Sequence, residues 1–134
     1  LCVDPWAPWS GGRPSQGKQD AYLEKARLVL AGFNVDFIRK TSMEAVKDVA
    51  DGSLDFVYID ALHNFDNVML DLIHWAPKVR PGGIVSGHDY VRLHNCGVID
   101  AVHAYTFAHG VYHWYLTFEQ NTRHEPYQTW FWVR

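Results

Sequence analysis

The segment LDFVYIDALHNFDNVMLDLIHWA, residues 54–76, constrains the fold more than any other part of the chain. Its first part, residues 54–60, is apolar nearly throughout, a pattern typical of a parallel strand that helices cover on both faces. From Phe65 to Ala76, apolar side chains recur at offsets of 0, 3, 4, 7, 8 and 11, which predicts a helix with one fully apolar face. A buried strand followed by such a helix indicates an α/β fold.

The same alternation of strand and helix patterns continues on both sides of that segment. The expected strands cover residues 1–3, 34–40, 54–60 and 83–88, and the expected helices cover residues 18–31, 42–50, 65–76 and 98–109. Thr41 and Glu44 match a capping box, and RPGG at residues 80–83 reads as a break between a helix and a strand.

Two aromatic segments, residues 111–119 and 129–134, end the chain with no helix pattern between them. Such a pair is most simply antiparallel. We therefore expect a mostly parallel sheet with helices on both faces, completed by an antiparallel C-terminal hairpin.

Size and charge limit the organisation of the chain and its partners. With 134 residues, 48% of them hydrophobic, the sequence suits a single domain over residues 1–134. A net charge of -3 gives no electrostatic reason to expect nucleic acid or an anionic membrane as partner, so we expect a small molecule. Cys2 and Cys96 lack the spacing of metal ligands and are expected to be reduced, which favours a cytoplasmic location.

Polar side chains follow each of the four expected parallel strands. In chain order they are Asp4, then Thr41 and Ser42, then Asp60 with His63, and then His88 with Asp89. Ligands of open α/β sheets bind beyond the carboxyl ends of the strands, so these residues are candidates for one site. Each also has a structural interpretation: Asp4 as a turn former, Ser42 as a helix cap, His63 as a histidine at a helix entry and His88 as a structural histidine.

Motifs within residues 51–90 resemble those of a known family. They read Ile59, Asp60, His63, Phe65 and Val68; Asp71, Leu72 and Trp75; Arg80, Pro81, Gly82 and Gly83; and Gly87, His88, Asp89 and Tyr90. This order is similar to the signature of the class I S-adenosylmethionine-dependent methyltransferases, within the group that acts on small molecules. Arg80 stands where that family usually has lysine, and Phe65 where it has tyrosine. The resemblance implies a Rossmann-like methyltransferase fold, a three-layer α/β sandwich.

The resemblance also implies a set of residues that bind S-adenosylmethionine. By position, Asp4 matches the acidic residue that binds the ribose hydroxyls, and Pro5 and Trp6 lie beside the adenosine. Ser42 and Met43 match the pair that flanks the adenine. Asp60 and Ala61 match the strand end near the methionine moiety and the transferred methyl group.

The catalytic residues implied in the same way are His63 and Asp89. His63 is placed to act as general base, because a neutral imidazole can take the proton of the acceptor. In metal-dependent relatives, carboxylates at the positions of Asp60 and Asp89 hold Mg²⁺ or another divalent cation. Relatives that bind the metal often have two acidic residues where this chain has His88 and Asp89.

A glycine-rich loop and the strand before it, which the family has upstream of the position of Asp4, have no counterpart in the sequence. In the family, that strand lies between the strand ending at Asp4 and the one ending at Asp60. Three explanations compete: the chain is a fragment, the two strands pair directly in a contracted sheet, or a second chain supplies the missing strand. We favour the fragment, and so expect a partial, N-terminally truncated methyltransferase domain.

The leading hypothesis is S-adenosylmethionine-dependent methyl transfer to a small-molecule acceptor, in particular a hydroxyl. An inactive methyltransferase-like module that binds a nucleoside or forms oligomers is the alternative from the class of binding proteins. A metal-dependent hydrolase using Asp60, His63, His88 and Asp89 is a third hypothesis. The sequence leaves a homo-oligomer open.

Overall fold

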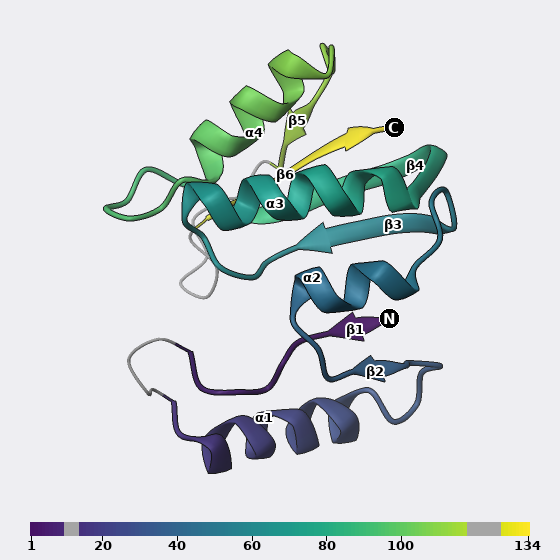
Figure 1. Cartoon of the computed structure of the whole chain (residues 1–134), viewed down its shortest axis with the longest axis vertical. Coiled ribbons are helices and arrows are strands. Elements are labelled where there is room, and N and C mark those ends of the chain that lie inside the picture. Colours follow the sequence, from purple (N-terminus) through teal and green to yellow (C-terminus); the bar gives the residue numbers. More distant parts are fainter. Residues whose placement is uncertain (10–13, 118–126) are drawn as a thin grey trace. The chain divides into compact units, whose positions relative to one another are not determined.

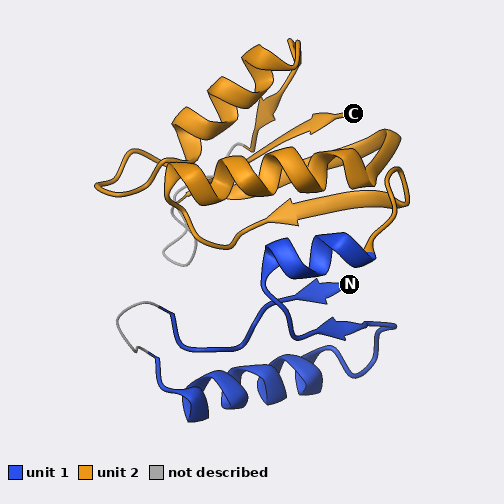
Figure 2. Cartoon of the chain, in the orientation of Figure 1, with its two compact units in different colours: residues 1–48 blue, residues 49–134 orange. Residues whose placement is uncertain are grey.

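The computed structural model describes residues 1–9, 14–117 and 127–134, and it is an α/β structure (Figure 1). It divides into two compact units, residues 1–48 and 49–134 (Figure 2). The described helices and strands of each unit follow in chain order, and each unit has a sheet of its own. That residues 1–134 form a single domain stays a prediction.

The first unit contains a two-stranded parallel sheet, two α-helices and a short 3₁₀ helix. Its elements are β1 (Cys2–Val3), α1 (Gln16–Val29), β2 (Phe37–Ile38), α2 (Ser42–Ala45) and η1 (Val46–Asp48). Cys2 pairs with Phe37 and Val3 with Ile38, so the two strands run in the same direction. The expected strands and helices are present, although β2 and α2 are shorter than their sequence patterns.

The predicted capping box explains where α2 begins. The Glu44 carboxylate accepts hydrogen bonds from the backbone N–H of Thr41 at 3.0 Å and from its hydroxyl at 2.6 Å. These bonds lower the pKa of Glu44, the hydroxyl of Thr41 contributing most. The first turn of α2 is therefore set by a local polar motif that the sequence shows directly.

The second unit contains a four-stranded mixed sheet, two α-helices of 11 residues each and a short 3₁₀ helix. Its elements are β3 (Leu54–Ile59), α3 (Phe65–Trp75), η2 (Ala76–Lys78), β4 (Val79–Tyr90), α4 (Val98–Ala108), β5 (Tyr115–Leu116) and β6 (Gln128–Val133). The strand order is β3-β4-β6-β5, with β3 parallel to β4 and β6 antiparallel to both β4 and β5. The antiparallel pairing of the two aromatic segments is confirmed; residues 118–126 lie outside the described part of the chain.

Helices α3 and α4 pack against each other and against one face of this sheet. Leu72 of α3 and Val102 of α4 are fully buried with Val85 and Trp130 of the sheet in one apolar cluster. Alternation along a strand sends neighbouring side chains to opposite faces. Side chains on the other face, such as Phe56 at 52% exposure, reach solvent.

Within the described part of the second unit, the second face of the sheet carries aromatic side chains that reach solvent. On the second face, Phe56 stacks on Tyr58 with ring centroids 6.3 Å apart, and the Tyr58 hydroxyl lies 3.2 Å from the Thr129 hydroxyl. β3 thus carries apolar side chains on both faces, and those of Phe56 and Tyr58 contact each other. A near-continuous apolar run thus does not by itself tell where each face is packed.

The RPGG segment is not the break that its composition predicts. Residues Arg80–Gly83 belong to β4, whose pairing with β3 shifts from Leu54–Val79 to Phe56–Ile84. Gly82 takes a φ of +77°, which glycine adopts without strain, and its N–H donates to the carbonyl of Arg134 at 2.7 Å. The segment is an irregularity within a long strand, and Gly82 and Gly83 exchange backbone hydrogen bonds with Arg134.

Among the described residues, β1 and β3 belong to separate sheets. Among the described helices, none is both long enough and apolar enough to span a membrane.

Candidate active site

The carboxyl ends of β3 and β4 position the candidate catalytic residues. Asp60 follows the last residue of β3, Asp89 lies near the end of β4, and His63 lies in the short loop before α3. The Asn64 side chain caps α3 by accepting a hydrogen bond from the backbone N–H of Asn67 at 3.0 Å, which fixes the point where this loop becomes helix. Since β3 and β4 are parallel neighbours, their carboxyl ends meet at one edge of the sheet.

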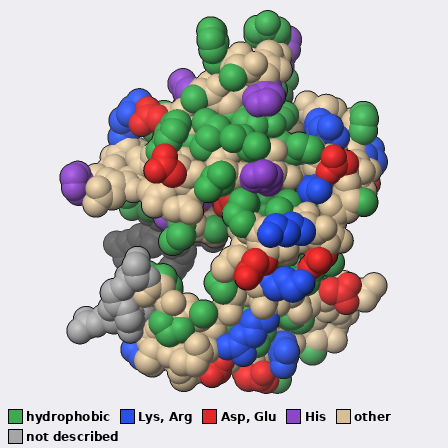
Figure 3. Space-filling model, in the orientation of Figure 1, with side chains coloured by type: hydrophobic (Ala, Val, Ile, Leu, Met, Phe, Trp, Pro, Cys, Tyr) green, Lys and Arg blue, Asp and Glu red, His purple; other side chains and the backbone are tan. Residues whose placement is uncertain are grey.

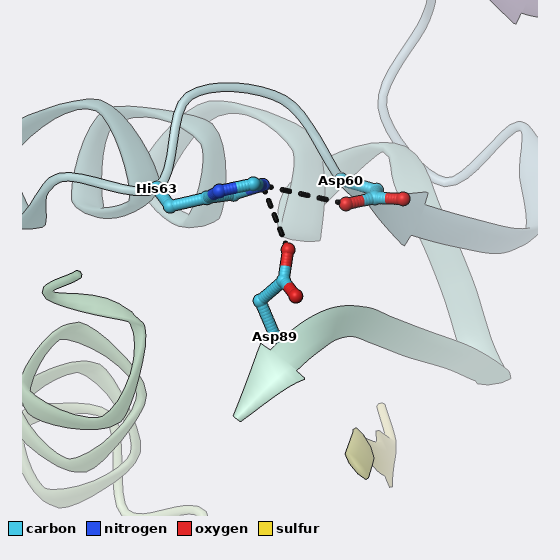
Figure 4. Close-up of side chains that lie close together, drawn as sticks. All are labelled: Asp60, His63 and Asp89. Carbon is cyan, nitrogen blue, oxygen red and sulfur yellow. Dashed lines mark ion pairs between the residues drawn. The ribbon is translucent and has the colours of Figure 1, made fainter. Parts of the chain in front are cut away.

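His63 points between the two carboxylates (Figure 4). Its Nε2 lies 2.9 Å from Oδ2 of Asp89 and 3.5 Å from Oδ1 of Asp60. The Asp89 side chain is 14% exposed, whereas those of His63 and Asp60 are 45% and 46% exposed. The cluster therefore has one half-buried carboxylate, that of Asp89, and an imidazole that a ligand can reach.

The geometry assigns different roles to the two nitrogens of His63. Two carboxylates next to Nε2 favour a proton on that nitrogen, so Nδ1 is left as the basic nitrogen of the neutral ring. This arrangement suits a general base that must take and briefly hold one proton.

Asp89 is held in an unusual backbone conformation. Its φ is +54°, a region that residues other than glycine seldom adopt and that is often found at functional sites. Its carbonyl accepts a hydrogen bond from the N–H of Val91 at 2.8 Å and contacts the thiol of Cys96 at 3.7 Å. Local contacts thus maintain the conformation that turns its carboxylate toward His63.

His88 lies beside the cluster but does not join it. Its Nδ1 is 3.4 Å from Oδ1 of Asp89, on the carboxylate oxygen opposite to the one that faces His63. Its Nε2 is buried and has no hydrogen-bond partner among the described residues. The group of possible metal ligands found in the described part of the chain is Asp60, His63 and Asp89, whose ligand atoms lie within 4.8 Å of one another.

The predicted ribose-binding residues form a tight turn after β1. Oδ1 of Asp4 accepts a hydrogen bond from the backbone N–H of Trp6, so the turn-forming interpretation of Asp4 has a structural basis. Asp4 and Pro5 are exposed, whereas Trp6 is 6% exposed and packs against Phe37 with ring centroids 6.1 Å apart. The carboxylate of Asp4 is therefore presented on a turn that its own hydrogen bond shapes.

Three side chains hold this turn, and the sequence patterns did not reveal them. The Trp6 carbonyl accepts hydrogen bonds from Gln16 at 2.9 Å and from Arg39 at 3.0 Å. Gln19, which is 6% exposed, donates to the Ala7 carbonyl at 3.1 Å. These partners lie 10 to 33 residues away in the sequence, so no local spacing could have indicated them.

Ser42 and Met43 form the first turn of α2, and both are half-buried. Ala61 follows Asp60 directly and is exposed. Of the predicted site residues, the structure brings Asp60, His63 and Asp89 into direct contact in the second unit. Asp4, Pro5, Trp6, Ser42 and Met43 belong to the first unit.

Comparisons with known proteins point to one family. A family model described as a methyltransferase domain matches residues 1–90. Over 62 residues, which are 46% of this chain, the sequence is 40% identical to the uncharacterized protein y4gI of Sinorhizobium fredii. That region is 7% of the relative's length.

Two solved structures are similar in fold. One, from Klebsiella pneumoniae, is described as "a putative O-methyltransferase"; it matches with a TM-score of 0.60 and 17% identity over 86% of this chain and 57% of its own. The other is a protein of Corynebacterium glutamicum, with a TM-score of 0.55 and 14% identity over 97% of this chain and 58% of its own. The chain thus spans less than two thirds of the length of each of these proteins.

These likenesses agree with the α/β architecture and with the motifs at the strand ends. The two solved structures show that the fold is Rossmann-like. The family match covers 90 of 134 residues and includes every predicted site residue from Asp4 to Asp89. The chain therefore belongs to the family of methyltransferase domains.

Proposed function

We propose that the protein transfers a methyl group from S-adenosylmethionine to a small-molecule acceptor, and that the reacting group of the acceptor is a hydroxyl. The observation that carries the proposal is the imidazole of His63, which is 45% exposed and lies 2.9 Å from the half-buried carboxylate of Asp89 at the carboxyl end of a parallel strand pair. Methyl transfer requires close alignment of donor and acceptor and the removal of one proton. A supported, accessible base meets the second requirement.

His63 is the group that removes the proton. The hydroxyl of the acceptor would give its proton to Nδ1, while Nε2 keeps its own proton beside Asp89 and Asp60. The resulting imidazolium lies beside the two carboxylates and then gives its proton to solvent. When bound, S-adenosylmethionine supplies a methyl group on a positively charged sulfur.

The residues that would hold the cofactor fit its polar groups. The exposed carboxylate of Asp4 is a suitable acceptor for the two hydroxyls of a ribose. Because Gln16, Gln19 and Arg39 fix the backbone of its turn, little ordering is needed when the ribose binds. Ser42 and Met43 would face the adenine, and Asp60 and Ala61 would lie near the methionine moiety.

A divalent cation fits the same cluster chemically. Asp60, His63 and Asp89 offer two carboxylate oxygens and one imidazole nitrogen, a donor set that suits Mn²⁺ better than the oxygen-preferring Mg²⁺. A bound cation would supply Lewis acidity toward the acceptor hydroxyl. Addition of Mn²⁺ to the purified protein tests this directly: an unchanged melting temperature and no broadening of the NMR signals of His63 would exclude the ion.

Cofactor binding and transfer can be tested in two steps. Calorimetry with S-adenosylmethionine and with its demethylated product is expected to show micromolar binding that Asp4→Ala abolishes. Lys18→Ala removes an exposed charge from α1 and is expected to leave binding unchanged. An absence of binding by the unmodified protein would contradict the proposal.

Transfer is then measured as release of the demethylated product in the presence of a panel of hydroxylated small molecules. His63→Ala is expected to abolish the release, whereas His74→Ala, which removes an exposed histidine of α3, should not change it. Binding without release for any acceptor would favour the inactive nucleoside-binding module. The hydrolase hypothesis requires His88 as a metal ligand. His88 lies outside the group of possible ligands formed by Asp60, His63 and Asp89, which disfavours that hypothesis.

A further inference from the structure

Two consecutive residues, Cys96 and Gly97, contact the backbones of the two catalytic residues. The N–H of Gly97 donates to the carbonyl of His63 at 2.8 Å. The thiol of Cys96 donates to the carbonyl of Asp89 at 3.7 Å. One dipeptide therefore connects the loop after β3 with the end of β4, at the point where the side chains of His63 and Asp89 meet at 2.9 Å.

The close approach at Gly97 requires the absence of a side chain. A Cβ atom at this position would lie 2.4 Å from the backbone nitrogen of Phe65 and 2.6 Å from its Cα. Backbone atoms cannot rotate away as the end of a side chain can. The φ of Gly97 is −109°, which any residue adopts, so the requirement is one of space and not of conformation.

The position of Gly97 is itself determined by the apolar core. Gly97 is the N-cap of α4, and its carbonyl accepts the first hydrogen bond of that helix from the N–H of Ala101 at 2.9 Å. Ala101 and Val102 of α4 are fully buried in the main apolar cluster. The helix therefore gives the His63 loop a rigid point of attachment, although the side chain of His63 is itself exposed.

We propose that Cys96 and Gly97 act as a clamp that sets the distance between His63 and Asp89, with Gly97 as the main positioning residue. The contacts of Gly97 with His63 and of Cys96 with Asp89 support the effect of the clamp on the geometry of the His63–Asp89 pair. Its effect on turnover rests on the proposed methyl transfer. The two can fail separately, because the first is measured by NMR without any substrate.

The first measurement uses the unmodified protein. The hydrogen bond from Gly97 to His63 is expected to give a scalar coupling between the Gly97 nitrogen and the His63 carbonyl carbon, and slow exchange of the Gly97 amide proton. Exchange as fast as that of an unstructured peptide, with no coupling, would overturn the clamp.

The second measurement compares two glycine substitutions with similar steric cost. Gly97→Ala places a Cβ against the backbone of Phe65; Gly83→Ala places one 2.5 Å from Val79 Cγ1 and 2.6 Å from the carbonyl oxygen of Asp55, toward the opposite end of β4. Both variants are expected to be less stable than the parent protein. The difference between the ¹⁵N shifts of Nδ1 and Nε2 of His63 should shrink in Gly97→Ala alone, because only there does the carboxylate of Asp89 cease to favour one tautomer.

Turnover should likewise fall in Gly97→Ala and not in Gly83→Ala. A displacement of ~1 Å between a base and its support costs about 100-fold in rate, so Gly97→Ala is expected to lose about that factor with unchanged affinity for S-adenosylmethionine. Gly83→Ala should retain its rate once the folded fraction is taken into account. Equal changes at His63 in both variants would show that Gly97 has only a general role in stability and would overturn the proposal.

Cys96 provides an independent variant in case Gly97→Ala does not fold. Cys96→Ala removes the thiol contact with the Asp89 carbonyl and leaves the Gly97 hydrogen bond in place. The difference between the ¹⁵N shifts of Nδ1 and Nε2 of His63 should shrink in Cys96→Ala, but less than in Gly97→Ala. The control Cys2→Ala should leave that difference unchanged. Identical spectra of His63 in Cys96→Ala and the parent would remove Cys96 from the clamp.

Discussion

The two units of the molecule hold their site residues by different kinds of interaction. In the second unit, the residues around Asp60, His63 and Asp89 rest on an apolar cluster that includes Leu72 and Trp130, both fully buried. In the first unit, the turn at Asp4 is held by side-chain hydrogen bonds. Figure 3 shows the contrast on one face: hydrophobic side chains gather over α3 and α4, and charged side chains gather over the elements of the first unit.

This difference predicts which property a substitution will change in each unit. Apolar burial is collective, so a change in the second unit's core is felt by the whole unit and by the base that depends on it. Hydrogen bonds to a turn are individual, so a change in the first unit should alter one binding surface and little else. Stability and ligand affinity should therefore respond separately.

The largest effect is expected from Leu72→Ala. Leu72 is fully buried between α3 and the sheet, and deletion of such a side chain costs about 2–5 kcal/mol because a cavity remains. The free energy of unfolding, measured with urea, gives the result. Ile73→Ala is the matched control on the same helix, since Ile73 is 45% exposed. Equal losses in the two variants would show that this cluster is not the core of the unit.

The next effect concerns the two carboxylates beside His63. Asp89 is nearer to Nε2 than Asp60 is, at 2.9 Å against 3.5 Å, and its side chain is less exposed. General-base catalysis contributes about 10²–10⁴-fold, so Asp89→Asn should lose a large part of that range and Asp60→Asn clearly less. Rates of methyl transfer, with circular dichroism as a check of folding, decide the order. A larger loss in Asp60→Asn would contradict the role of Asp89 as the main support.

A smaller effect is expected in the first unit from Arg39→Ala. The guanidinium of Arg39 donates to the Trp6 carbonyl at 3.0 Å and to Asp20 at 2.6 Å. Loss of such a bond costs on the order of 1 kcal/mol, so calorimetry should show affinity for S-adenosylmethionine lowered about fivefold to tenfold. The His63 signals should not move. Lys40→Ala, which breaks the exposed pair with Asp48, should leave the affinity unchanged.

The smallest effect is a local pH dependence at α2. Hydrogen bonds from Thr41 lower the pKa of Glu44 from its ordinary value of 4.5. A carboxyl with a lowered pKa stabilises the folded state above its ordinary pKa, and this contribution is lost as the pH falls through the lower folded value. Protection of the first amides of α2 should therefore decrease below pH 4.5. Glu44→Gln should remove that pH dependence; an unchanged profile would assign it to another group.

The sequence was sufficient to predict the features that depend on neighbours in the chain. The apolar period of residues 65–76 predicted α3, and Thr41 with Glu44 predicted the start of α2. The placement of Asp60 and Asp89 after parallel strands predicted that they would meet, because strand direction and order follow from the βαβ pattern. His63 was included because Ile59, Asp60 and His63 resemble the family signature.

Other features depend on contacts between distant segments and left no local signal. The RPGG segment is a bulge and not a break: β4 continues through it, and Arg134 exchanges backbone hydrogen bonds with Gly82 and Gly83. Nothing in the sequence around Gln19 and Arg39 distinguishes them from other polar residues. The fold nevertheless brings their side chains into hydrogen bonds with the turn after β1. Cys96 and Gly97 read as a loop, and only the approach of the Phe65 backbone reveals why a glycine is needed there.

The sequence by itself determined the class of fold, the order of its elements and the chemical types available at the strand ends. Periodicity and capping act over a few residues, so they can be read without a structure. The tertiary structure decided that His63 lies between two carboxylates, that one face of the second sheet is packed by helices, and that α4 holds the His63 loop. Those outcomes depend on distances between segments far apart in the chain, which packing sets and no local pattern records.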